Sequence, residues 1–154
     1  MSLREELGDF NSIVCFKAVV TGVEETLGKA TAAVALIAAG RKRGRNLVRE
    51  LGMSGEGADL AKAGERLSEA LGANGTRLCK VGPITEEGEN IRVVVSETVC
   101  MAGEPQGTDR TCTFTLGAVH GALEELTGRK LKGVHKESRW RGADDDVFEF
   151  RPRI

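Results

Sequence analysis

The fold is decided by the stretch Cys112-Thr-Phe-Thr-Leu-Gly-Ala-Val-His-Gly-Ala-Leu-Glu-Glu-Leu-Thr-Gly128. Its apolar side chains recur at helical spacing, which predicts an amphipathic helix, and a glycine such as Gly128 commonly ends one. Two strand-like segments follow, at residues 130–137 and in a stretch that ends in Val147-Phe-Glu-Phe150. A helix followed by two strands indicates a small domain of helices and sheet rather than an enzyme with a recognisable catalytic motif.

The rest of the chain predicts three helices and two strands before this stretch. Apolar residues at helical spacing predict helices at residues 11–27, with Asn11 or Ser12 as its cap, 29–51 and 58–71. Strands are predicted at residues 76–81 and 90–97, the second with Ile91, Val93 and Val95 alternating onto one face. A hairpin-like loop is predicted at Pro83 and 86–90, and a mobile loop at 102–110. The order ααα-ββ-α-ββ predicts an α+β fold, with about four helices packed as a layer on a twisted antiparallel sheet of about four strands.

Composition limits the classes of function. The chain has 154 residues, about one domain, so we expect a single domain over residues 1–154 with a core at about 10–150. A net charge of −1 argues against nucleic-acid binding, and no apolar run reaches the ~18 residues of a membrane span. The acidic start lacks a signal peptide, which predicts a cytoplasmic protein. Four cysteines without a CxxC pair are then expected to be thiols, and no metal site is predicted.

Glycines and alanines indicate close helix packing. Residues 30–40 are nearly all small or apolar, so this part of the second helix is expected to be buried on most sides or to line a cavity. Gly40 and Gly44 lie one turn apart and would let another backbone approach. Gly117 and Gly121 have the same spacing and would allow close packing against another helix, the favoured reading, or against a ligand.

Three further motifs each have a structural and a functional interpretation. The basic run 41–45 is a solvated helix face, which we favour, or a contact for a carboxylate or phosphate head group. The acidic run 144–146 is a turn or, less favoured, part of a divalent-cation site. Trp140, between Arg139 and Arg141, covers a pocket mouth or anchors a partner, or else packs on its own loop; both interpretations stay open.

Cys112 and His120 are the candidate polar contacts on the decisive helix. His120 is either a half-buried histidine bonded to backbone, the favoured reading, or a ligand of a metal, a tetrapyrrole or another bound molecule. Cys112 near the helix start is a buried thiol or a site of modification or ligand contact. Two helical turns separate them by about 12 Å, too far for a thiol hydrolase, and no catalytic residue is assigned.

Many weak matches in the right order resemble the 4-vinyl reductase, or hydrocarbon-binding, domain. The matches cover about residues 10–150 and are Val23-Glu-Glu-x-Leu27-Gly28, Ala39-Gly40-Arg41 with Gly44-Arg45, Cys112-Thr-Phe114, Gly117-x3-Gly121-x2-Glu124-Glu-Leu-x-Gly128, Val134, Glu137-Ser138 and Phe148-Glu-Phe150. The resemblance implies a fold similar to TRAPP core subunits and haem-based nitric-oxide sensor domains. Arg139 and Val147 or Phe148 stand where many members have cysteines, which argues against a cysteine-based metal site here. No haem-ligating histidine carries over.

The resemblance implies a stand-alone domain that binds a small hydrophobic ligand (a tetrapyrrole, its precursor or an acyl chain) as carrier, sensor or assembly factor. We expect the pocket between the first, second and fourth helices above the sheet, with Phe148 and Phe150 as floor or plain core. The predicted ligand-binding residues are Phe16, Leu36, Ile37, Cys112, Phe114, Leu116, His120 and Trp140. A dimeric interaction or scaffold module with a filled core is the alternative, and an accessory subunit in tetrapyrrole vinyl reduction the second. The expected partners are the ligand, a second copy of the chain and another protein; the cofactor stays unknown.

Overall fold

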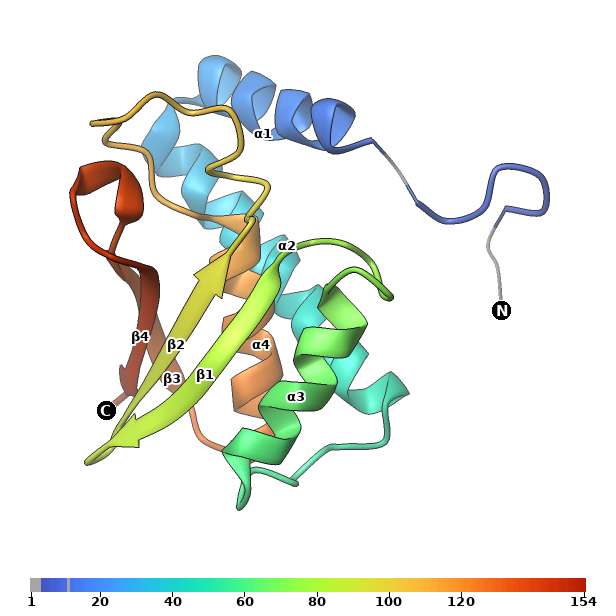
Figure 1. Ribbon diagram of the computed structural model, residues 1–154, viewed down its shortest axis with the longest axis vertical. Helices are drawn as coiled ribbons and strands as arrows, with labels where there is room; N and C mark the ends of the chain where they lie inside the picture. Colours follow the sequence, from blue (N-terminus) through green and yellow to red (C-terminus); the bar gives the residue numbers. More distant parts are fainter. Residues whose placement is uncertain (1–3, 11) are drawn as a thin grey trace.

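The computed structural model describes residues 4–10 and 12–154 (Figure 1). These residues form helices and strands in the predicted order ααα-ββ-α-ββ, which confirms the α+β fold class. The helices are α1 (Ile13–Leu27), α2 (Lys29–Glu50), α3 (Leu60–Leu71), α4 (Phe114–Thr127) and the short 3-10 helix η1 (Arg139–Arg141). The strands are β1 (Lys80–Glu87), β2 (Asn90–Ser96), β3 (Leu131–Glu137) and β4 (Asp146–Pro152).

The sheet is antiparallel throughout, in the order β1-β2-β4-β3. The predicted alternation of β2 is confirmed, with Ile91, Val93 and Val95 buried and the residues between them half-buried. The prediction for β1 was wrong: the strand begins later than residue 76 and continues past Pro83 to Glu87. Proline is tolerated because β1 is an edge strand and the pairing register shifts between Val81 and Ile84.

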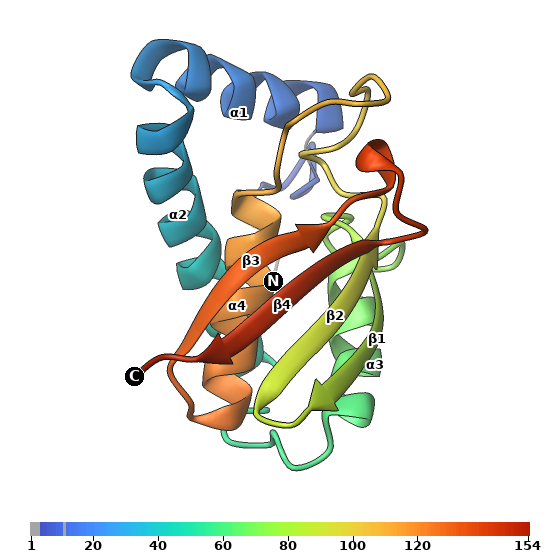
Figure 2. The ribbon, with the colours of Figure 1, turned by 90° about the vertical axis from the view of Figure 1, so that its left-hand side faces the viewer.

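The helices cover only one face of the sheet. α3 packs against β1 and α4 against β3, while α2 lies along α4. The face turned to the viewer in Figure 2 carries no helix. On that face Glu149 lies beneath the exposed side chains of Lys136 and Arg151 and accepts a hydrogen bond from each, so the face is polar.

Two apolar clusters of very different size form the interior. The large one lies between the sheet, α3, α4 and the second half of α2, and includes the fully buried Phe148 and Phe150. The small one joins α1 to the first half of α2 through Val20, Ala32 and Leu36. The small cluster therefore holds α1 on the domain with far fewer buried side chains.

Four glycines bring α2 and α4 into backbone contact. A Cβ atom on Gly40 or Gly44 would collide with the carbonyl oxygens of Phe114 or Ala118, far inside van der Waals distance. A Cβ on Gly117 or Gly121 would likewise collide with carbonyls of α2. The favoured prediction, packing against another helix, is confirmed, and the two glycine pairs pack against each other's helix.

The first half of α2 is not covered as predicted. Val34 is 73% exposed, and Ala35 and Ala38 are exposed too, because α1 contacts this half from one side only. Ile13 and Leu27, two of the apolar residues that recur at helical spacing in α1, are about half exposed as well.

One residue joins α1 to α2. Gly28 caps α1, its N–H donates to the Glu24 carbonyl, and its backbone angles are φ 81° and ψ 153°. This conformation is essentially restricted to glycine. At the other end of α1, the Ser12 side chain accepts from the Val14 N–H, so Ser12 is the cap; the alternative, Asn11, lies outside the described residues.

No helix among the described residues combines the length and apolar character needed to cross a membrane.

Candidate functional site

Four of the eight predicted ligand-binding residues lie where α1, α2 and α4 meet. Phe16 of α1 and Phe114 of α4 pack edge to face, with ring centroids 5.2 Å apart. Leu36 of α2 belongs to the small cluster with Phe16, and Ile37, the next residue, packs against the large cluster. We call Phe16, Leu36, Ile37 and Phe114 the seam, because they join three helices at this junction.

The other four predicted site residues occupy three different places. Cys112 and Leu116 are buried in the large cluster. His120 is buried against β3, where its Nε2 donates to the Leu131 carbonyl at 2.7 Å. Burial lowers the pKa of His120, so the ring is neutral. Backbone bonding, the favoured reading of this histidine, is thus what the structure shows. Trp140 is half-buried against the large cluster rather than exposed.

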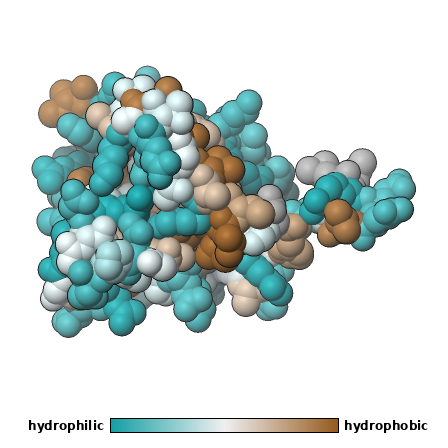
Figure 3. All heavy atoms as spheres, turned by 90° about the horizontal axis from the view of Figure 1, so that it is seen from above, coloured by the Kyte–Doolittle hydropathy of each residue, from teal (hydrophilic) through white to brown (hydrophobic). Residues whose placement is uncertain are grey.

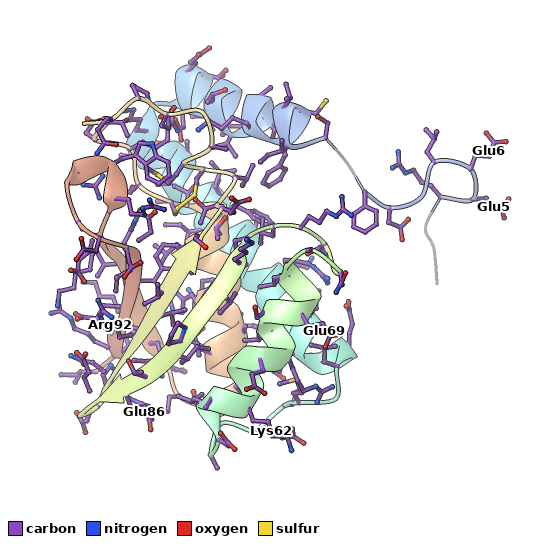
Figure 4. The ribbon with its side chains drawn as sticks, in the orientation of Figure 1. Glu5, Glu6, Lys62, Glu69, Glu86 and Arg92 are labelled. Atoms are coloured by element: carbon purple, nitrogen blue, oxygen red, sulfur yellow. A yellow bond between two sulfur atoms is a disulfide. The ribbon has the colours of Figure 1, made fainter. Side chains whose placement is uncertain are left out.

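Cys112 is not a free thiol. It forms a disulfide with Cys100, their Cα atoms being 5.3 Å apart (Figure 4). The prediction of four thiols was therefore wrong for this pair, while Cys15 and Cys79 are free. Burial raises the pKa of the Cys79 thiol to about 12, so Cys79 is unreactive.

A buried histidine on β3 supports the start of α4. His135 Nδ1 accepts the backbone N–H of Cys112 at 3.0 Å, and its Nε2 donates to Asp146 at 3.0 Å. Burial lowers the pKa of His135 despite the neighbouring carboxylate. Because the pKa is lowered, the ring is neutral at neutral pH, with its proton on Nε2. The sequence reading missed this pair because it placed Asp146 in an exposed acidic turn. The alternation shared with Phe148 and Phe150 was the signal that would have placed Asp146 inward.

Two threonine hydroxyls at the start of α4 have no hydrogen-bond partner among the described residues. Thr113 occupies the N-cap position, yet its side chain does not cap the helix, and Thr115 is fully buried. A buried hydroxyl without a partner costs free energy, on the order of 1–3 kcal/mol. The two hydroxyls flank Phe114 along the chain, on the turn that carries the seam.

A charged network holds the loop between β2 and α4 against α1. Arg110 donates to Glu24 of α1 at 2.6 Å and also to Glu104, and Lys17 of α1 donates to the Cys100 carbonyl at 2.6 Å. Burial would raise the pKa of Glu104, but hydrogen bonding from Arg110 and the charges of Lys17 and Arg110 outweigh it and keep the pKa low. The indole N–H of Trp140 donates to the Glu104 carbonyl at 2.9 Å. The loop expected to be mobile is thus tied down at several points, and Trp140 is one of its supports.

Two hollows open on the surface away from the seam. One, of about 520 Å³, lies beside the start of α3, where Lys62 is labelled in Figure 4. The other, of about 410 Å³, is lined by five arginines of α2, the α4–β3 turn and the end of the chain, together with Lys130, Gly128, Glu124 and Glu125. Within the described residues no three His, Cys, Asp or Glu side chains gather as a metal site would require.

Comparison with known proteins gives likeness in structure but not in sequence. No family model and no curated protein matches the chain. The phenol-responsive sensory domain of the transcription activator PoxR, solved with phenol, is similar with a TM-score of 0.69 at 15% identity, over 94% of this chain and 76% of that one. A trafficking protein particle complex subunit 3 from Naegleria fowleri, covalently bound to palmitic acid, is similar with a TM-score of 0.54 at 14% identity, over 93% and 98%. At these identities the likeness shows the fold alone, and it confirms the expected similarity of fold to a TRAPP subunit.

Proposed function

We propose that residues 1–154 act as one domain that binds a small, mostly apolar molecule at the seam, as a carrier or sensor. The observation that carries this proposal is the pair of unpartnered hydroxyls, Thr113 and Thr115, on the helical turn that bears Phe114. Apolar sites commonly fix a ligand through a few well-placed polar groups. A ligand with an apolar body and one polar group would satisfy a hydroxyl that the protein leaves without a partner.

The ligands of the two similar structures have this chemistry. One is solved with phenol and the other is covalently bound to palmitic acid, each an apolar body with one polar end. Of the classes that the resemblance implies, an acyl chain suits the seam better than a tetrapyrrole, and a small aromatic such as phenol suits it as well. The reason is that Phe16 and Phe114 are already in contact, so a large planar ring system would have to separate α1 from α4.

The test is the isosteric variant Thr115→Val, titrated with phenol and with palmitate. We expect the ligand-free variant to be more stable than the parent, because an unpartnered hydroxyl is replaced by a methyl group of the same shape. Binding of the ligand whose polar group reaches Thr115 should weaken about tenfold, the loss of one hydrogen bond.

Thr127→Val is the matched control on the same helix. The Thr127 hydroxyl donates to the Leu123 carbonyl at 2.7 Å, at the far end of α4, so this variant should bind both ligands normally. Failure of the parent protein to bind either probe, together with a ligand-free mass for protein purified from its own host, would refute the proposal.

A dimeric interaction module is the second candidate, and an exposed apolar face favours it. Val14 of α1 is 74% exposed and Val34 of α2 is 73% exposed, with Ile13, Val19 and Leu27 also open to solvent. Hydrophobic side chains gather where α1 begins, beside the N-terminal segment, in the view from above (Figure 3). An extended apolar surface of this kind is typical of a protein–protein interface, and a second copy of this chain is the partner we propose.

Sedimentation of Val14→Glu and Val34→Glu tests this second function. A parental dimer should become a monomer in both variants, whereas Val134→Glu on the open face of the sheet should stay a dimer. A monomeric parent protein at high concentration would end the proposal.

Two further expectations, an accessory role in vinyl reduction and a cytoplasmic location, each have a consequence that can be tested. A role as accessory subunit in vinyl reduction would need a reductant supplied by a partner. A cytoplasmic location would expose the Cys100–Cys112 pair to reduction, since disulfides are rare in that compartment. The redox state of this pair in the native host therefore tests the predicted location.

A further inference from the structure

A second site is suggested by the hollow of about 410 Å³ at the ends of α2, α4 and β4. In Figure 2 the end of β4 lies beside the lower ends of these two helices. Six cationic side chains line the hollow: Arg41, Arg45, Arg49, Arg129, Lys130 and Arg153. Only two carboxylates, Glu124 and Glu125, accompany them, on a chain whose net charge is −1. Positive charge is thus concentrated here against the balance of the whole protein.

The carboxylates are already used by the protein itself. Glu124 accepts from Arg41 at 2.7 Å and Arg45 at 2.9 Å through one oxygen, and from the Leu131 N–H at 2.9 Å through the other. Burial opposes its ionisation, but the Leu131 N–H and the two arginines lower the pKa of Glu124 to about 2. Arg49 donates two hydrogen bonds to Glu125. Each carboxylate is thus already engaged by three donors of the protein, since Glu125 also accepts from the Ser54 hydroxyl.

Several donors in the hollow have no acceptor among the described residues. The side chains of Lys130 and Arg153 make no hydrogen bond or ion pair there, although their backbones are joined by an Arg153 N–H to Lys130 carbonyl bond. Arg129 reaches only the Glu89 carbonyl and, at 3.8 Å, Glu86 at the tip of the β1–β2 hairpin (Figure 4). The Nε of Arg41 is buried and unpartnered. An unpartnered buried donor of a charged group calls for an acceptor.

The geometry points to a binding site in this hollow for a small polyvalent oxyanion that carries phosphate or carboxylate groups. Guanidinium groups bind both through paired N–H donors, and the hollow has the volume of a small-ligand site.

Capping of the C-terminus of α4 does not account for the cluster. The helix dipole places about half a negative charge at that end, which one or two cations would balance. The hollow has four cations more than carboxylates, so most of its positive charge remains for a ligand.

Calorimetric titration with pyrophosphate and with citrate at about 0.15 M ionic strength, where exposed charges more than about 8 Å apart are largely screened, tests the site. We expect the parent protein to bind at least one probe, and a preference between them shows whether phosphate or carboxylate is the natural chemistry. The double variant Lys130→Gln/Arg153→Gln should weaken binding by about tenfold or more, because it removes two charge-assisted donors. Both side chains are exposed, so the fold should be unaffected.

The matched control is Lys42→Gln/Arg43→Gln. It removes the same charge, from the α2 helix that also carries Arg41 and Arg45, but neither residue lines the hollow. Its affinity should stay within about twofold of the parent, since distant exposed charges are largely screened. Equal weakening by both double variants would show unspecific attraction, and no binding of either probe by the parent would exclude the site. Neither result depends on what the seam binds.

Discussion

The α2–α4 pair and helix α1 are attached to the domain in opposite ways. α2 and α4 touch backbone to backbone through Gly40, Gly44, Gly117 and Gly121, and the pair borders the large cluster. α1 is held by the small cluster and by the Arg110–Glu24 contact, and much of its apolar surface faces solvent. The two proposed functions, ligand binding at the seam and dimerisation, both involve α1. Binding surfaces and mobile elements are usually found in such loosely attached regions.

The largest expected effect comes from a substitution that disrupts the close packing of α2 against α4. Gly44→Ala places a methyl group against the backbone of α4, where neither helix can move aside. We expect a loss of about 3 kcal/mol or more in the free energy of unfolding, from urea denaturation followed by circular dichroism. A loss below about 0.5 kcal/mol would mean that the two helices lie farther apart than the structure places them.

The disulfide stabilises the loosely attached region around α1 and the loop before α4. The Cys100→Ala/Cys112→Ala variant opens a loop with a sequence separation of 12 residues, which should cost about 3 kcal/mol of stability. Hydrogen exchange should rise in α1 and in the loop before α4, more than in α3. Cys15→Ser, which removes an exposed free thiol, serves as control and should change neither property. Equal stability of the parent with and without a reducing agent would contradict this assignment.

The pH dependence of the stability that Glu124 contributes tests the ion pairs at the far end of the α2–α4 pair. Its folded-state pKa of about 2 lies below the ordinary value of 4.5, so its contribution is complete above pH 4.5 and is lost as the pH falls toward 2. Glu124→Gln should therefore cost on the order of 2–3 kcal/mol at neutral pH and little near pH 2. Parallel stability curves for parent and variant across this window would show that the ion pairs contribute nothing.

The smallest effect has the opposite sign. A Cβ atom at Gly22, inside α1, would have no neighbouring atom within 4 Å, so Gly22→Ala meets no obstacle. Alanine should stabilise the helix by about 0.5–1 kcal/mol. The same substitution thus raises stability in α1 and lowers it in α2; destabilisation at Gly22 in thermal unfolding would show that α1 is packed more closely than the structure indicates.

Local signals predicted the elements well. The helical spacing of α4 and its glycine stop are confirmed, with Gly128 in the left-handed conformation at φ 69°. The alternation in β2 placed Ile91 and Val95 correctly on the buried face. These features depend on residues close in the sequence, which is why one sequence sufficed.

Features that depend on distant residues were missed. The Cys100–Cys112 bond requires a fold that brings the two Cα atoms together, and no CxxC spacing announces it. The exposure of Val34 depends on which segments cover α2, which its own alanine-rich sequence does not specify. One signal for the hollow was present in the sequence and was overlooked. A helix face shared by residues four apart carries Arg41, Arg45 and Arg49.

Gly28 gives the loose side of the molecule a mechanical property. The direction of α1 relative to α2 depends on two torsion angles of this one residue, which has no side chain and whose N–H and carbonyl are hydrogen-bonded to Glu24 and Ala32. A change in these angles would redirect α1 without unwinding either helix, once the Arg110–Glu24 and Lys17–Cys100 contacts open. Under the proposed function, a ligand that separates Phe16 from Phe114 would tilt α1 and so displace the exposed side chains of Val14 and Val19.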